Sequence, residues 1–119
     1  MNAPVRPGFA VGHLSLTTPN LEQTVAFFST LRARAVFQTD GMAILEIRGG
    51  THLVVRTGAA VDPSFDLMVD EVDDVHAELA EQGYAVTELQ RGKIHTSFAV
   101  TDGAGLRHRI TSSHVVGQV

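Results

Sequence analysis

Apolar and polar positions follow the same order of patterns twice along the chain. In the first half, residues 9–17 alternate apolar with small or polar side chains, which predicts a strand. Residues 21–31 then place apolar side chains three and four positions apart, which predicts a helix with one buried face. The second half repeats this order over residues 65–69 and 72–82. Such a twofold repeat predicts two similar modules packed around one shared cleft.

Three more strands are expected in each module, separated by turn-forming segments such as Thr39-Asp40-Gly41 and Gly49-Gly50. The expected strands cover 35–38, 42–48 and 51–57 in the first module and 85–89, 93–101 and 106–111 in the second. Both modules thus have the predicted order β-α-β-β-β, and the fold class is α+β. We expect a single domain over 1–119, with module one at about 9–57, a connector at 58–63 and module two at about 64–113.

The composition of the chain limits the classes of protein to which it can belong. A chain of 119 residues with 44% hydrophobic content is long enough for one core. The net charge of −4 and the scattered basic residues give no support to a nucleic-acid surface, and the absence of cysteine excludes disulfides and thiolate chemistry. No segment approaches the ~20 apolar residues of a membrane helix or resembles a signal peptide. We therefore expect a cytoplasmic protein without membrane or nucleic-acid partners.

Several segments carry a resemblance to a known superfamily. Residues 11–16, followed by 19–22 and 27–28, resemble the opening of the vicinal oxygen chelate superfamily, which includes glyoxalase I, bleomycin-resistance proteins, fosfomycin-resistance enzymes and extradiol dioxygenases. Residues 70–79 resemble the start of its second module, and 97–105 resemble its penultimate strand and turn. The resemblance implies that both modules form a curved mixed sheet cup with helices on the convex side. It also implies a small-molecule ligand and a homodimer.

The resemblance also indicates which residues of this chain stand at the metal-binding positions of the superfamily. In catalytic members a divalent metal is held by residues on the first strands of the modules and by a glutamate on the closing strand. His13 occupies the first position, whereas Ser64 and Arg109 stand at the other two, and Val54 at the matching position of module one has no donor. A guanidinium repels a metal ion. We therefore expect no metal centre of the usual kind and no cofactor, with His13 as the one candidate metal ligand.

Strand alternation predicts which side chains share the cup. If His13 faces inward, the same alternation brings a polar set to the inner face. These candidate ligand-binding residues are His13, His52, His95, Asp66, Arg107 and Arg109. Arg109 is either a clamp for an anionic ligand or a structural partner of Asp66. Both parities of strands 42–48 and 51–57 contain apolar residues, so the side on which Glu46 lies stays open. A register shift of one residue would bring His108 into the cup.

Three functions follow from these residues. The favoured one is a glyoxalase or bleomycin-resistance type binding protein that takes an organic, anionic ligand through Arg109 and His13, although Arg107 and Arg109 argue against cationic bleomycin itself. The second is a divalent-metal-dependent lyase, isomerase or dioxygenase that uses an altered ligand set, His13, His52 and His95. The third is catalysis without metal, in which His13 or His95 is the general base. The sequence leaves open whether the chain is an enzyme.

Overall fold

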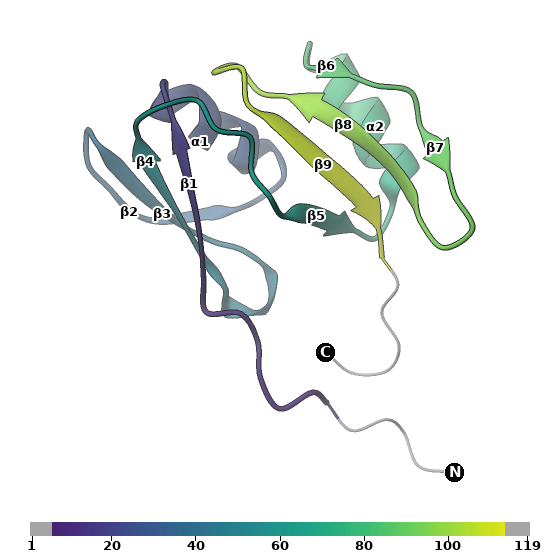
Figure 1. Cartoon of the computed structure of the whole chain (residues 1–119), viewed down its shortest axis with the longest axis horizontal. Helices are drawn as coiled ribbons and strands as arrows, with labels where there is room; N and C mark the ends of the chain where they lie inside the picture. The colour runs from purple at the N-terminus through teal and green to yellow at the C-terminus, as the bar shows by residue number, and fades with distance from the viewer. Residues whose placement is uncertain (1–5, 114–119) are drawn as a thin grey trace.

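The chain folds into two βαβββ modules, and the computed structural model describes residues 6–113 (Figure 1). Module one consists of β1 (His13–Thr18), α1 (Leu21–Thr30), β2 (Arg34–Gln38), β3 (Met42–Glu46), a 3-10 turn (Arg48–Gly50) and β4 (His52–Thr57). Module two repeats this order, except that its second strand is divided into two short ones: β5 (Asp66–Val69), α2 (Val72–Glu81), β6 (Ala85–Val86) and β7 (Gln90–Arg91), β8 (Thr96–Thr101) and β9 (Arg107–Ser112). The predicted α+β class and the two-module order are confirmed.

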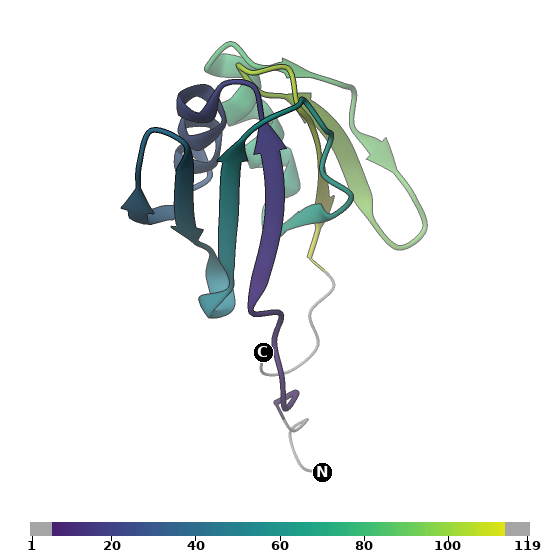
Figure 2. The same ribbon diagram turned by 60° about the vertical axis from the view of Figure 1, so that its left-hand side comes forward.

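Each module has its own mixed sheet. The strand order is β1-β4-β3-β2 in the first sheet and β5-β9-β8-β6 in the second, with β7 also paired to β8. In both sheets the first strand of the module is an edge strand and runs parallel to the last strand. The helices lie behind the strands of the first sheet in Figure 2, so the opposite face of that sheet is open. None of the helices within residues 6–113 is long and apolar enough to cross a membrane.

Helix α1 begins and ends where its sequence dictates. The Asn20 side chain caps it and accepts a hydrogen bond from the backbone N–H of Gln23 at 3.2 Å. Its apolar face buries Leu21, Phe27 and Phe28. The helix ends before Arg32, whose φ of +70° is left-handed and breaks the helical repeat.

Strand alternation divides the first sheet into a buried and an open face. Ala43, Leu45, Leu53 and Val55 are fully buried or nearly so, whereas their neighbours along the strands are at least partly exposed. This resolves the parity that the sequence left open: Glu46 shares the open face with His52, its register partner. The predicted alternation of β1 is also confirmed, because Leu16 is buried and His13 is exposed.

Three predicted boundaries were wrong. Residues 9–12 are not a strand, because the partner strand β4 begins only at His52, whose N–H binds the carbonyl of Gly12 at 2.9 Å. The single strand expected over 85–89 is instead the two short strands β6 and β7. The strand expected from residue 93 begins at Thr96, because a turn closed by the hydrogen bond from Gly92 N–H to the His95 carbonyl at 2.8 Å precedes it.

A buried polar chain joins the two modules. The Thr24 hydroxyl lies 2.8 Å from the hydroxyl of Thr18 and donates to the carboxylate of Asp102 at 2.9 Å. The same carboxylate oxygen lies 2.9 Å from Nε2 of His108, whose ring stacks on Phe27 of α1 at a centroid distance of 4.4 Å. Helix α1 therefore belongs to the core of both modules. We call the residues Thr18, Thr24, Asp102 and His108 the junction network.

Candidate functional site

The open face of module one carries a row of ionisable side chains across four strands. His13 and His52 are register partners on β1 and β4, and their rings meet edge to face with centroids 6.0 Å apart. Nε2 of His52 lies 3.6 Å from a carboxylate oxygen of Glu46, whose other oxygen accepts a hydrogen bond from Arg34. Arg34 fixes Glu46, and Glu46 in turn favours one orientation of His52. We call His13, His52, Glu46 and Arg34 the histidine face.

The open face of module two carries a second set of polar side chains, with two arginines among them. Arg107 and Arg109 lie two residues apart on β9 and are both exposed. Arg109 is the register partner of Asp66 on β5, and its Nη2 lies 3.4 Å from the hydroxyl of Ser97 on β8. Asp66 is exposed as well. We call Arg107, Arg109, Asp66 and Ser97 the arginine face.

Neither arginine of this face is neutralised. In the described part of the chain no ion pair involves Arg107 or Arg109, so the alternative that Arg109 pairs with Asp66 is not found. The backbone N–H of Arg107, and not its guanidinium, is bound by the Asp62 carboxylate at 2.9 Å. Exposed guanidinium groups of this kind are chemically suited to binding a carboxylate or a phosphate.

The structure brings some of the predicted site residues together and separates others. His13 and His52 meet on one sheet, and Asp66 and Arg109 are neighbours on the other. Across residues 6–113, no hydrogen bond or ion pair joins the histidine face to Asp66, Arg107 or Arg109. His95 lies in the turn before β8 and on neither sheet.

Sequence reasoning missed Ser97 and Arg34, and it left open on which side of its strand Glu46 lies. Ser97 was expected to face inward but was not named as a candidate, and Arg34 was not considered. The signal for Arg34 is the hairpin turn at residues 39–41, because counting outward from it pairs β2 with β3 and places Arg34 opposite Glu46. However, a bulge between Ala35 and Phe37 shifts the pairing of β2 with β3, and the position of such a bulge could not be located from the single sequence.

His108, the alternative cup residue, is fully enclosed. Its side chain is 1% exposed and that of Asp102 is 0% exposed. Burial alone raises the pKa of Asp102, but hydrogen bonds from His108, Thr24 and the backbone N–H groups of Leu106 and Ala104 outweigh it and hold the pKa below its ordinary value. The expected register of β9 is therefore confirmed: Arg109 lies on the exposed face of the strand, and His108 packs on the buried face within the junction network.

Solved structures identify the fold. No family model and no curated protein sequence matches the chain. A lactoylglutathione lyase from Agrobacterium tumefaciens superposes with a TM-score of 0.76 at 18% identity, covering 90% of this chain and 96% of that one. The fosfomycin resistance protein FosX from Listeria monocytogenes gives 0.72 at 16% identity, covering 89% and 92%. The oxidase ChaP-H2 gives 0.71 at 15% identity, covering 94% and 98%. The chain has the vicinal oxygen chelate fold.

The residues at the usual metal positions of the vicinal oxygen chelate fold do not fit a divalent cation. His13 supplies one imidazole, Ser64 is an exposed hydroxyl in the bend before β5, and Arg109 supplies a positive charge. Within residues 6–113, no group of three or more histidine, aspartate or glutamate side chains is arranged to hold a metal ion. The altered set His13, His52 and His95 is thus not assembled, because His95 stays in the turn of module two.

Proposed function

We propose that the chain is a small-molecule binding protein that holds an organic anion, such as a carboxylate, on the arginine face without a bound metal. One observation carries the proposal. Arg109, at the position where the resemblance places a metal-binding glutamate, is exposed and has no carboxylate partner in the described residues. A fixed cation there replaces the charge that a metal ion would otherwise offer to an oxygen ligand.

The chemistry of the arginine face supports this ligand class. Two residues along a strand place Arg107 and Arg109 roughly 7 Å apart on one face, close enough for both guanidinium groups to reach one small dianion or one carboxylate and a second oxygen. The hydroxyl of Ser97 adds a neutral hydrogen-bonding group beside Arg109. Asp66 on the neighbouring strand accepts a hydrogen bond from a hydroxyl or ammonium group of the same ligand. A hydroxy acid or an amino acid has the chemical groups to interact with all of these side chains.

A structural neighbour offers a related example. An E126Q variant of FosX is known in complex with manganese and 1S,2S-dihydroxypropylphosphonic acid, and it superposes with a TM-score of 0.69 at 14% identity, covering 85% of this chain and 87% of that chain. That ligand combines an anionic group with hydroxyl groups. In the present chain, Arg107 and Arg109 provide the positive charge, so we expect such a compound to bind without manganese.

The test is a ligand screen on metal-free protein. Malonate, lactate, phenylacetate and methylphosphonate are titrated while the thermal midpoint is followed, since a ligand that binds the native state raises it. We expect a rise for at least one anion, and we expect Arg109→Ala to remove it. Arg91→Ala is the matched control, because Arg91 is an equally exposed arginine whose carboxylate partner Asp73 lies away from this face.

Metal analysis of the purified protein accompanies the screen. A stoichiometric metal, or a midpoint raised by zinc, nickel, manganese or ferrous iron and lost in His13→Ala, contradicts the proposal and restores the metal-dependent lyase, isomerase or dioxygenase reading. Anion binding that survives Arg109→Ala contradicts the assignment to the arginine face.

A second candidate function rests on the histidine face. The row Arg34, Glu46 and His52 resembles the arrangement by which a carboxylate orients an imidazole for proton transfer. Under this proposal His52 takes a proton from a bound hydroxy acid. His52→Gln should then abolish turnover of a ligand found in the screen while leaving its affinity unchanged, and retained turnover would contradict the role.

We also propose a homodimer in which the histidine face of one copy and the arginine face of the other share a ligand. The support is that the two faces lie on different sheets and make no polar contact within one chain. Mixing His52→Gln protein with Arg109→Ala protein tests this through turnover, because a mixed dimer then contains one intact site of its two. Random exchange makes about half of the dimers mixed, so turnover should recover to about a quarter of the wild-type rate, whereas no recovery upon mixing means that each chain acts on its ligand alone. The expected cytoplasmic location stays a prediction.

A further inference from the structure

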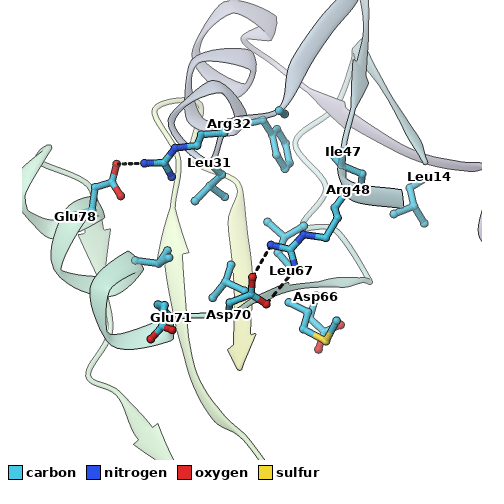
Figure 3. A pocket seen from close by; sticks show the side chains of 15 residues that line it. Leu14, Leu31, Arg32, Ile47, Arg48, Asp66, Leu67, Asp70, Glu71 and Glu78 are labelled. Atoms are coloured by element: carbon cyan, nitrogen blue, oxygen red, sulfur yellow. Dashed lines mark hydrogen bonds and ion pairs between the residues drawn. The ribbon is translucent and has the colours of Figure 1, made fainter. Parts of the chain in front are cut away.

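A recess lies between the two modules. A cavity of about 690 Å³ is bounded by residues of β1, the end of α1, the segment after β3, strand β5 and helix α2 (Figure 3). Strands β1 and β5 are both edge strands of their sheets, so the cavity lies between two unpaired edges. Asp66 is the member of the arginine face that also lines it. Its volume is within the usual range of roughly 300–1,000 Å³ for small-molecule sites.

The lining of this cavity is largely apolar and comes from both modules. Leucine, valine and phenylalanine side chains that pack against the core also line the cavity. These side chains include Leu14, Phe28 and Leu31 from module one and Leu67, Val69 and Val75 from module two. A ligand with an aromatic or aliphatic body is therefore stabilised by leaving water, at about 25 cal/mol for each Å² of apolar surface buried.

The charged groups around the cavity are unequal in number. Arg48 donates two hydrogen bonds to the carboxylate of Asp70, at 3.1 and 3.0 Å, and Arg32 lies 4.0 Å from the carboxylate of Glu78 (Figure 3). Both guanidinium groups are thus occupied by carboxylates of module two.

Two further carboxylates have no such partner. Asp66 and Glu71 also line the cavity, and neither has a hydrogen bond or ion pair from its side chain among the residues that the structure describes. Four carboxylates face two guanidinium groups, so the lining has an excess of two negative charges.

We propose that this inter-module cavity binds an organic cation with an apolar body, such as an aromatic amine. The apolar lining takes the body, and the unpaired carboxylates attract the ammonium group. An anion is disfavoured, because the two arginines already have their partners. The site shares Asp66 with the arginine face but differs from it in the sign of its charge and in the rest of its lining. Since its lining comes from both modules, a bound amine also stabilises their relative arrangement.

The experiment compares two probes that share one ring system. Tryptamine is a cation at neutral pH, and indole-3-propionate is an anion. Binding of each to the full chain is measured by calorimetry and mapped by amide chemical shifts. We expect tryptamine to bind and to shift amides of β5 and of the first turn of α2, with at least tenfold higher affinity than indole-3-propionate. Arg109→Ala removes a cation beside Asp66 but none from the cavity lining, so it should not weaken tryptamine binding, whereas it should remove binding at the proposed anion site.

Two variants, each with a matched control, test the assignment. Ala33→Leu adds volume to the lining, whereas Ala80→Leu adds the same volume on an exposed part of α2. Glu71→Gln removes one unpaired charge, whereas Glu81→Gln removes an equal charge at the other end of the helix, outside the cavity. We expect Ala33→Leu to weaken tryptamine binding at least tenfold, Glu71→Gln to weaken it about threefold, and both controls to leave it unchanged.

Several outcomes overturn the proposal. They are equal or tighter binding of indole-3-propionate, no binding of tryptamine at millimolar concentration, and amide shifts confined to other elements. If Glu71→Gln binds tryptamine with unchanged affinity, the unpaired carboxylates do not attract the ammonium group. This result contradicts the proposal even if Ala33→Leu does not fold.

Discussion

The junction network and the two open sheet faces use the same kinds of side chain for different ends. His108 and Asp102 are 2.9 Å apart with side chains 1% and 0% exposed, and they join the modules. His52 and Glu46 are 3.6 Å apart with side chains 36% and 30% exposed, and they lie on an open sheet. Residue type alone therefore does not distinguish a structural histidine from a site histidine in this chain. The difference lies in which side of the strand carries it.

Burial also changes what each pair contributes. The Asp102 carboxylate receives hydrogen bonds from Thr24 and His108 on one oxygen and from the backbone N–H groups of Ala104 and Leu106 on the other. Water is excluded there, so loss of one partner leaves a buried charge unsatisfied. On the open faces water replaces a lost partner, and the cost is small.

Removal of the Asp102 carboxylate should give the largest loss of stability. We expect Asp102→Ala to lower the free energy of unfolding by about 3–5 kcal/mol, because Thr24, His108 and two backbone N–H groups lose their acceptor in the core. Urea unfolding followed by circular dichroism measures it. Asp73→Ala is the control, since Asp73 pairs with Arg91 on the surface. A loss of less than 1 kcal/mol for Asp102→Ala would show that the junction network is dispensable.

The same carboxylate should make the fold sensitive to acid. Its pKa is lower in the folded protein than the ordinary value of about 3.9. The stabilisation that this shift represents is complete above about pH 4 and disappears as the pH falls through the folded pKa. Unfolding midpoints in urea at pH 7, 4 and 3 measure it. We expect the difference between wild type and Asp102→Asn to narrow as the pH falls, whereas a constant difference contradicts the role of ionised Asp102.

Much of the fold was predictable because its signals are local and agree with one another. Asn20 caps α1 as expected, and both modules have the expected order of strands and helices. The inner and outer sides of β1 and β9 also followed from alternation alone, since one face of each strand is buried.

The site was less predictable because it depends on long-range geometry. The expectation that three histidines share one cup treats the two sheets as a single surface, but His95 lies in a turn and the remaining residues divide between two sheets. The buried role of His108 depends on Asp102 six residues earlier and on Phe27 of the other module. No pattern within one segment carries that information.

Loss of Arg109 should separate binding from stability. We expect Arg109→Ala to weaken the binding of an anion at least tenfold, which corresponds to about 1.4 kcal/mol, because a charge-assisted hydrogen bond is lost. Its free energy of unfolding should change by less than about 0.5 kcal/mol, since the residue is exposed. Calorimetry with the best anion of the screen, together with urea unfolding, measures both. Stability that falls by more than 2 kcal/mol would instead assign Arg109 a structural role.

The smallest effect is expected on the histidine face. Glu46 lies between Arg34 and His52 at a solvent-exposed site, where ion pairs contribute about 0–1 kcal/mol. Glu46→Gln keeps the shape of the side chain and removes its charge, so we expect the free energy of unfolding to fall by less than 1 kcal/mol. Raising the salt concentration to 1 M should remove most of that difference, because exposed charges are screened.

The outcome for Glu46→Gln bears on how the two regions are to be understood. If the variant is as destabilised as Asp102→Ala, Arg34, Glu46 and His52 form a structural unit like the junction network, and the proton-transfer proposal for His52 loses its basis. If it is nearly neutral, the ion pairs of this face contribute little to folding. A carboxylate held by Arg34 beside an exposed imidazole then has no structural explanation, and a role toward a ligand becomes the physical reason for its placement.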